Sequence, residues 1–308
     1  MGLGMRPAAA LALLLAATAT PSAPPAGPEA GPEAIVLGIA QDGGIPHLGC
    51  LQALCVEARR DPTKRRMVAA LGLVDAAAGR RFLIDATPDL PAQVELLGGL
   101  PDAILLTHAH IGHYLGLAQL GREVVNAKNL PVYCTASMAR FLRANKPWSR
   151  LVERGNVAIR EIEAGKEFRL TEHLRVTAIR VPHRDEDSDT VAYLVRGPRR
   201  RVLWLPDIDC WEKWDRDLSD FAADADLTMF LDGTFFSADE IPGRAIEDIP
   251  HPLVPDTMDL LSRRGTPPAS VRFVHLNHTN RLSWDAGALR RLEARGFGVA
   301  RQGEKLSL

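Results

Sequence analysis

The sequence lacks an excess of charge of either sign. It contains 37 lysines and arginines and 38 aspartates and glutamates, which give a formal net charge of -1. This balance gives the protein no overall positive potential, which disfavours binding to nucleic acid or to a membrane surface through its overall charge. A local basic groove is still compatible with the composition. Cysteine is also scarce. Four cysteines among 308 residues are too few for a disulfide-dense scaffold.

The N-terminal region has the pattern of a cleavable signal peptide over 1–19. Arg6 precedes an apolar run of about a dozen residues, which is too short to span a bilayer comfortably. Small residues at 17–19 offer a cleavage site. The Pro-, Ala- and Gly-rich stretch 20–33 cannot pack as a core, so it is interpreted as a flexible tether rather than as part of a buried helix. We therefore expect a periplasmic or secreted protein with no membrane span after cleavage.

The remaining chain, 34–308, shows no repeat and no second linker, which favours one domain. Short apolar or β-branched runs predict strands, and 3.6-residue patterns predict helices between them. The predicted strands are 34–40, 68–76, 81–86, 103–108, 131–135, 157–163, 175–183, 190–197, 201–207, 227–234 and 271–278. The predicted helices are 88–97, 115–120, 136–144, 257–264 and 284–295. This order favours two mixed sheets covered by helices on their outer faces.

Three histidines within six residues, His108, His110 and His113, follow the predicted strand 103–108. His108 and His110 alternate on one side of an extended segment, so both imidazoles can face one ion. His113 lies a turn onward, before a helix expected to begin near Gly116, and could reach the same ion or a neighbouring one. A lone histidine here would more often be a satisfied core residue, but three so close together favour metal binding.

The stretch "HAHIGH" resembles the His-x-His-x-Asp-His signature of the metallo-β-lactamase superfamily, with Gly112 in the place of the aspartate. Stretches 82–86, 180–195, 201–209 and 273–280 resemble the family's other landmarks in the same order. The resemblance implies an α/β (α+β) fold, a four-layer αββα sandwich. It also implies the ligands: His108, His110 and His183 for a first ion, His113 and His275 for a second, and Asp207 as the bridge.

The glycine at position 112 weakens the expectation for the second ion. In the family, the aspartate at this place binds that ion and orients or deprotonates the attacking water. The second site is therefore expected to be weaker or differently built, with Asp209 or His278 as substitute ligands or as outer partners. Histidines with one carboxylate suit zinc, as one or two ions, but also iron or manganese. Taken singly, His183 could end an ordinary strand and Asp207 could cap a helix.

Two later stretches, 229–236 and 246–261, resemble the tRNA 3′-processing nucleases and related phosphodiesterases. In that branch Asp232 and His251 correspond to a dyad whose imidazolium protonates the leaving oxygen. A buried carboxylate can raise the pKa of a histidine and fix its tautomer, which suits a general acid. The alternative is an aspartate that caps a turn and a surface histidine before Pro252.

The segment 37–55, "LGIAQDGGIPHLGCLQALC", resembles the opening of the pyrroloquinoline-quinone biosynthesis protein B group and its cyclic-phosphate phosphodiesterase relatives. Those proteins hold a structural zinc with a cysteine cluster. Here Cys50 and Cys55 remain, with His47 nearby, so a structural metal and a disulfide are both open. The "QDGGIP" stretch could also be only a hairpin turn at a sheet edge.

The resemblances imply a metal-dependent hydrolase that acts on a phosphodiester, cyclic phosphate or other ester, and the N-terminal pattern predicts that it is exported. A bound metal lowers the pKa of water and polarises the scissile group. Asp207 would position ions and hydroxide, and the Asp232–His251 pair would protonate the departing oxygen. One alternative is an iron-dependent oxidative enzyme like the quinone-biosynthesis group, which fits export awkwardly. Another is a non-catalytic metal-binding protein. A β-lactamase is less favoured because the dyad belongs to the phosphodiesterase-like branch. A homodimer is left open.

Overall fold

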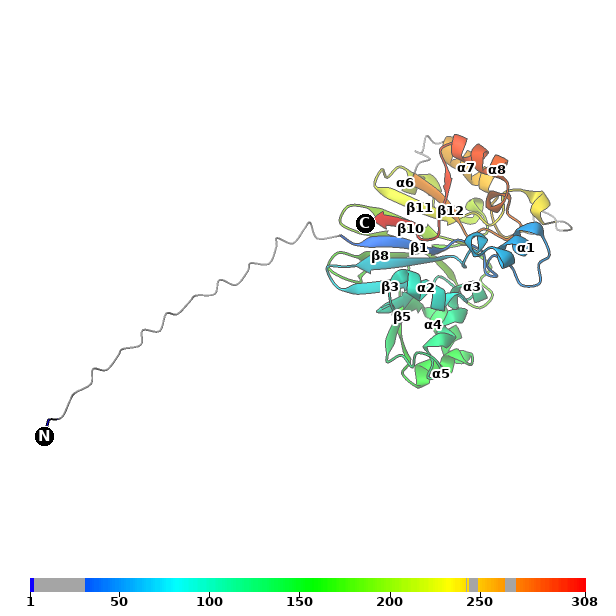
Figure 1. Ribbon diagram of the computed structural model, residues 1–308. Helices are drawn as coiled ribbons and strands as arrows, with labels where there is room; N and C mark the ends of the chain where they lie inside the picture. Colours follow the sequence, from blue (N-terminus) through cyan, green and yellow to red (C-terminus); the bar gives the residue numbers. More distant parts are fainter. Residues whose placement is uncertain (3–30, 242, 244–248, 264–269) are drawn as a thin grey trace.

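The computed structural model describes residues 1–2, 31–241, 243, 249–263 and 270–308. Two seven-stranded sheets pack together, and helices cover their outer faces (Figure 1). The predicted four-layer αββα sandwich is therefore confirmed. The predicted signal peptide and tether fall almost wholly within 3–30, outside the described residues. In the part of the chain that is described, no helix is long and apolar enough to cross a membrane.

The first sheet has the strand order β14-β1-β2-β3-β4-β5-β6, and the second has the order β13-β12-β11-β10-β9-β8-β7. The first comprises β1 Glu33–Gly38, β2 Ala70–Asp75, β3 Arg80–Ile84, β4 Ala103–Leu105, β5 Leu130–Thr135, β6 Val157–Ile162 and β14 Lys305–Ser307. The second comprises β7 Glu167–Arg169, β8 Arg175–Val181, β9 Thr190–Arg196, β10 Arg201–Leu205, β11 Leu227–Asp232, β12 Val271–Val274 and β13 Gly298–Val299. Each predicted strand has a counterpart, and β7, β13 and β14 were not predicted.

Helices and single turns connect the strands. The α-helices are α1 Ala53–Arg60, α2 Leu90–Leu97, α3 Ile111–Tyr114, α4 Ala136–Ala144, α5 Trp148–Glu153, α6 Leu218–Ala222, α7 Val254–Arg263 and α8 Ala286–Ala294. The 3-10 turns are η1 Pro62–Lys64, η2 Leu115–Leu120, η3 Trp211–Lys213, η4 Ala238–Glu240 and η7 Arg281–Ser283.

The helix expected near Gly116 begins earlier and is not one regular helix. It starts as the single turn α3 and continues as the 3-10 segment η2. The carbonyl of His113 accepts from the amide of Ala86, 2.8 Å away, and the amide of Gly116 donates to the carbonyl of Ala86, also at 2.8 Å. These bonds fasten the turn to the end of β3, which replaces the hydrogen bonds of a continuous α-helix.

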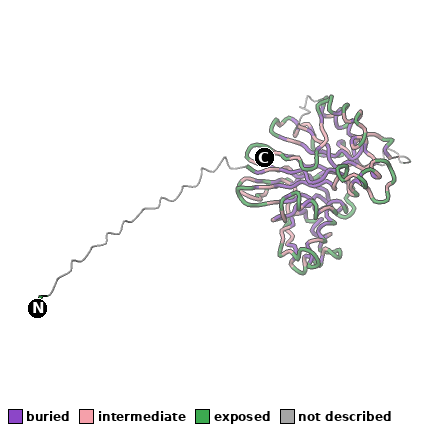
Figure 2. The backbone as a smooth tube through the Cα atoms, viewed as in Figure 1, coloured by how far each residue is buried: buried purple, intermediate pink, exposed green. Residues whose placement is uncertain are grey.

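Alternation along the strands divides the buried residues between two layers. In β3, Phe82 and Ile84 belong to the core between the sheets, whereas the intervening Leu83 packs in the core under the helices of the first sheet. This two-residue period is what a strand covered on both faces requires. The buried residues follow the strands and the exposed ones follow the periphery of the fold (Figure 2).

The fold brings several strand ends to one edge. Strands β10, β11 and β12 are parallel neighbours, so the residues that follow their carboxyl ends lie at the same edge of the second sheet. In the first sheet, β4 leads directly into His108. Ligand sites of α/β proteins commonly form at such carboxyl ends.

Candidate metal centre

Three histidines from two loops form a first cluster. Nε2 of His108 lies 2.9 Å from Nδ1 of His110, and Nε2 of His183 lies 3.3 Å from the same Nδ1. Four zinc ligands at about 2.1 Å in a tetrahedron lie about 3.4 Å from one another. The structure thus brings the three predicted ligands of the first ion together, with all three nitrogens within 4.8 Å of one another.

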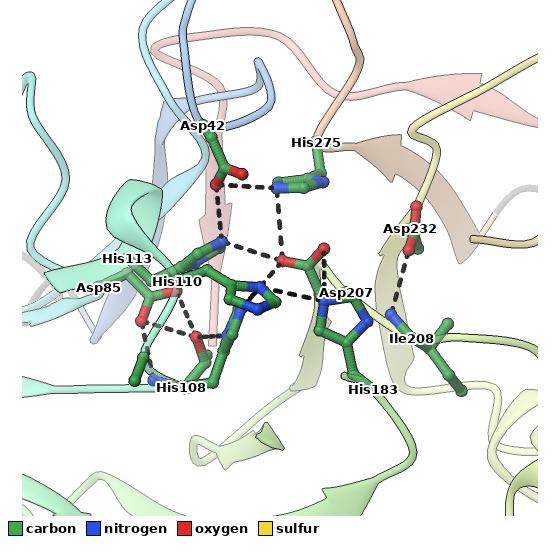
Figure 3. A network of polar contacts seen from close by, with 12 residues as sticks. Asp42, Asp85, His108, His110, His113, His183, Asp207, Ile208, Asp232 and His275 are labelled. Carbon is green, nitrogen blue, oxygen red and sulfur yellow. Dashed lines mark hydrogen bonds and ion pairs between the residues drawn. The ribbon is translucent and has the colours of Figure 1, made fainter. Parts of the chain in front are cut away.

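A second cluster forms around Asp207 (Figure 3). Its Oδ2 lies 2.9 Å from Nε2 of His113 and 3.3 Å from Nε2 of His275. The same carboxylate faces the first cluster, with Oδ2 3.8 Å from Nε2 of His108 and Oδ1 3.8 Å from Nε2 of His183. Asp207 thus stands between the two clusters, at the place where a bridging ligand is needed.

The second ring nitrogen of each predicted histidine ligand faces a partner that fixes the orientation of the ring. Such outer partners orient metal-bound histidines and set their tautomers. The pairs are His108 with Thr107 at 3.0 Å, His110 with Glu186 at 2.9 Å, His113 with Asp85 at 2.8 Å, His183 with Asp209 at 3.4 Å and His275 with Thr234 at 3.0 Å.

Buried polar atoms without hydrogen bonds test whether the site fits a metal. Among the described residues, Nε2 of His113, Nε2 of His275 and Oδ2 of Asp207 are buried and have no hydrogen-bond partner. Such atoms are costly unless something else satisfies them. His275 also has a left-handed φ of 62°, a strained conformation for a residue with a side chain. These features fit a divalent metal, whose binding would satisfy all three atoms.

The electrostatics keep His108, His183 and Asp207 in their binding forms. For His113, burial alone would lower the pKa, but the carboxylates of Asp85 and Asp207 raise it well above its usual range. Burial lowers the pKa of His108 well below its usual range and that of His183 to about 4, so both imidazoles are neutral near pH 7. Burial alone would raise the pKa of Asp207, but the surrounding histidines, His275 foremost, hold it well below its usual range. Neutral imidazoles and an ionised carboxylate are the forms that coordinate metals.

Asp232 and His251 form the predicted dyad beside the metal clusters. Nδ1 of His251 lies 2.7 Å from Oδ2 of Asp232, and both side chains are buried. Burial alone would lower the pKa of His251, but the charge and hydrogen bond of Asp232, together with the charge of Asp207, raise it. The alternative of a surface histidine is therefore wrong. Asp232 also accepts from the amide of Thr234, so it caps a turn as well.

His278 lies away from both metal clusters, beside Cys55 and His47. It was predicted as a substitute ligand or outer partner of the second ion, but its Nδ1 lies 3.9 Å from Sγ of Cys55, and its ring packs 4.3 Å from that of His47. The chain changes direction at His275, whose φ is left-handed. His275 therefore faces Asp207, whereas His278 faces Cys55. Asp209, the other candidate, lies beside His183 as an outer partner.

Cys50, Cys55 and His278 form a separate group that could hold a metal ion. Both cysteines carry free thiols, so the predicted alternative of a Cys50–Cys55 disulfide is not realised. His47 contributes through its backbone, because its amide donates to Sγ of Cys55 at 3.3 Å. The group ties α1 to the loop that follows β12.

Comparison with known proteins agrees with this geometry. A family model described as a β-lactamase superfamily domain matches residues 80–276. This range includes both members of the dyad and the six ligands predicted for the two ions, which are His108, His110, His113, His183, Asp207 and His275. The chain belongs to the β-lactamase superfamily.

Relatives within this superfamily are similar over nearly the whole chain. Coenzyme PQQ synthesis protein B of Rhizobium meliloti (strain 1021) is 28% identical over 309 residues, covering 89% of this chain and 97% of the relative. The zinc-bound PqqB structure from Methylobacterium extorquens has a TM-score of 0.75 at 22% identity, covering 90% of this chain and 100% of the other. A diphosphatase of the PhnP family has a TM-score of 0.66 at 22% identity, covering 89% and 96%. The resemblance to the protein B group is therefore confirmed, and the two solved structures support the fold.

Sequence reasoning missed three polar residues of this superfamily site: Asp42, Asp85 and Thr234. Asp85 follows β3 with a left-handed φ of 69° and binds both His113 and Thr107. Thr234 lies within hydrogen-bonding distance of His251 and His275. Oδ1 of Asp42 lies 3.6 Å from Nε2 of His113. The "FLIDA" motif drew attention to Asp85 only as a family landmark, and Asp42 lies in a stretch typical of a turn.

Proposed function

We propose that the protein is a metal-dependent hydrolase of a small phosphodiester, cyclic phosphate or other ester. The observation that carries this proposal is the buried Asp232–His251 pair, 2.7 Å apart, beside two groups of potential metal ligands joined by Asp207. A metal centre supplies an acidic water and polarises the scissile oxygen. A proton donor adds most to hydrolysis when the departing oxygen is a strong base.

In this proposal each group of residues has a separate task. His108, His110 and His183 would hold the first ion and His113 and His275 the second, with the carboxylate of Asp207 between the two groups. Asp232 accepts from Nδ1 of His251, which leaves Nε2 of that ring to donate to the departing oxygen. Asp232 raises the pKa of His251, so the imidazolium form of the ring persists to a higher pH than that of an ordinary histidine. Zinc suits these ligands, and iron or manganese would also be accepted by them.

The direct test combines metal analysis with an ester assay. The protein, purified without chelator, is assayed on bis-p-nitrophenyl phosphate, a lactone and a β-lactam, alongside His110→Ala and His251→Ala. His173→Ala is a matched control, because His173 pairs with Asp75 outside the site. We expect phosphodiester turnover that His110→Ala abolishes, that His251→Ala reduces and that the control retains. Metal binding without turnover on any substrate would favour a non-catalytic metal-binding protein.

A second candidate is an iron-dependent oxidative function like that implied by the protein B resemblance. It is favoured by 28% identity that extends over 89% of the chain rather than over the metal signature alone. Tight iron binding, oxygen consumption with an added reductant and no ester hydrolysis would select this candidate. The same purified protein serves both assays.

Export completes the proposal. A positively charged start, a short apolar run and small residues at 17–19 support a signal peptide that is removed in the periplasm or on secretion. A small-molecule ester would be its substrate there, with no nucleic-acid partner.

A further inference from the structure

The carboxylate of Asp42 lies where a side chain at position 112 would lie. A Cβ on Gly112 would be 2.0 Å from Oδ1 and 2.9 Å from Cγ of Asp42. Heavy atoms cannot approach so closely, so a side chain at 112 and the present Asp42 side chain exclude each other. The space left free by the glycine is thus filled by a carboxylate from another part of the chain.

That carboxylate faces the second cluster. Oδ1 of Asp42 lies 3.6 Å from Nε2 of His113 and 3.9 Å from Nε2 of His275 (Figure 3). With the 2.9 Å and 3.3 Å that separate Asp207 from the same two nitrogens, the distances lie on both sides of the roughly 3.4 Å expected between tetrahedral ligands. Oδ1 is buried and has no hydrogen-bond partner among the described residues. Its direction and its unsatisfied state both match those of a ligand.

The backbone holds Asp42 against the segment that carries His275. The amide of Gln41 donates to the carbonyl of Leu276 at 2.9 Å, and the amide of Leu276 donates to the carbonyl of Ile39 at 2.8 Å. The amide of Gly44 closes a turn on the carbonyl of Gln41 at 2.7 Å, so Asp42 occupies the second position of that turn. The carboxylate is therefore placed by a fixed turn rather than by a free loop end.

The glycine itself has no backbone reason to be there. Gly112 is not among the glycines with a left-handed φ, and it lies in the helical turn α3, where other residues are more favourable. The close approach of Asp42 is the contact that requires the absence of a side chain. Gly112 and Asp42 thus act as a pair.

We propose that Asp42, from the turn after β1, is the carboxylate ligand of the second ion and takes the place that Gly112 leaves free. This inference rests on the metal centre of the proposed function. The second site is then complete, with His113, His275, Asp42 and Asp207. The sequence predicted a weaker or differently built second site. In this proposal the difference is that the carboxylate comes from the loop that holds Asp42 and not from position 112.

Metal stoichiometry and affinity test the proposal directly. Zinc is titrated into metal-free protein against a chromophoric chelator, and the loaded protein is analysed for zinc per chain. The variants are Asp42→Asn and Asp42→Ala, with Asp187→Asn as a matched control that removes an exposed carboxylate. We expect two ions for the wild type and the control. For the Asp42 variants we expect one ion at unchanged affinity and a second weakened by about 100-fold or more, beyond the 10–100-fold typical of outer partners.

A transplanted carboxylate gives an independent readout. In Asp42→Gly/Gly112→Asp the carboxylate returns to α3, and the backbone of the turn must shift to relieve the remaining close contact, 2.8 Å to Cα of residue 42. We expect this variant to recover part of the second-ion affinity that Asp42→Gly alone loses. If Asp42→Ala bound two ions with wild-type affinities, the proposed role of Asp42 would be overturned, while the metal centre of the proposed function would stand. A wild type that binds no ion would instead remove the metal centre itself.

Discussion

The proton-donor role of His251 predicts that the loss caused by its removal depends on the departing group. An alkyl phosphodiester releases a strongly basic alkoxide, which needs a proton as it departs. A p-nitrophenyl phosphodiester releases a stable phenolate, which does not need one. A positioned general acid contributes about 10²–10⁴-fold. We therefore expect His251→Ala to lower kcat by that range on an alkyl ester and by less than about 10-fold on the p-nitrophenyl ester.

The structure also shows why His251 is a cleaner target than its partner. Asp232 accepts from the amides of Thr234 and Ile208 at 2.9 and 3.1 Å, from the Thr234 hydroxyl at 2.7 Å and from His251 at 2.7 Å. An asparagine would turn its NH2 group towards a backbone donor in either orientation, which costs about 1–3 kcal/mol for each unmade bond. Asp232→Asn would thus mix a loss of stability with a loss of catalysis.

The assay measures kcat and KM for both esters with wild type, His251→Ala and the control His173→Ala, at equal metal content. Equal losses on the two esters would refute proton donation, because a role in binding or folding does not distinguish departing groups. A change confined to KM would point to substrate binding instead.

Three further predictions concern packing, pH and processing. In metal-free protein, Gly112→Ala should lower the free energy of unfolding by about 1–3 kcal/mol through overpacking against Asp42, and by less in an Asp42→Gly background; equal losses in the two chemical denaturation series would contradict the close approach. Asp75 is fully buried, and burial alone would raise its pKa, but bonds from Thr171, His173 and Ala78 lower it below its usual value. Its contribution to stability should therefore be present above the ordinary aspartate pKa of about 4 and be lost as the pH falls below it, and Asp75→Asn should show a flatter acid dependence of Tm. Finally, N-terminal sequencing of protein expressed with its own N-terminus should begin near residue 20 in the periplasmic fraction, whereas intact Met1 in the cytosolic fraction would argue against export.

The sequence was most informative where chemistry and periodicity coincide. The strands before His108, His183 and Asp207 are apolar and β-branched, and the polar residue after each strand end lies at the common edge of the sandwich. The pairing of Asp232 with His251 was also predicted, because both lie in stretches typical of one branch of the family. His108, His183 and Asp207 are close in space for the same reason that they are recognisable in the sequence: each follows a strand whose place in the fold is fixed by its hydrophobic pattern.

The contacts that could not be predicted depend on loops whose positions are set by tertiary packing. "QDGG" is typical of a turn. Nothing in this stretch indicates that the carboxylate of Asp42 lies beside the ring of His113, which is 71 residues further along the chain. A signal was nevertheless present, since a metal signature without its carboxylate calls for an acid from elsewhere. His278 was misplaced because the direction of the chain after His275 depends on the left-handed φ of that residue. The short strands β7, β13 and β14 lie at or near sheet edges, where the hydrophobic pattern is weakest.

The pairing of β1 with β14 also has a consequence for how the molecule folds. Glu33 lies opposite Ser307 in the first sheet, and Lys305 and Glu33 form an ion pair although 272 positions separate them. Contacts this distant along the chain require a large loop to close before they stabilise anything, and such topologies fold slowly. The open edge of β1 would remain available to strands of other chains until β14 arrives. We therefore expect refolding yield to depend on protein concentration, with dilution favouring the correct strand over an intermolecular one.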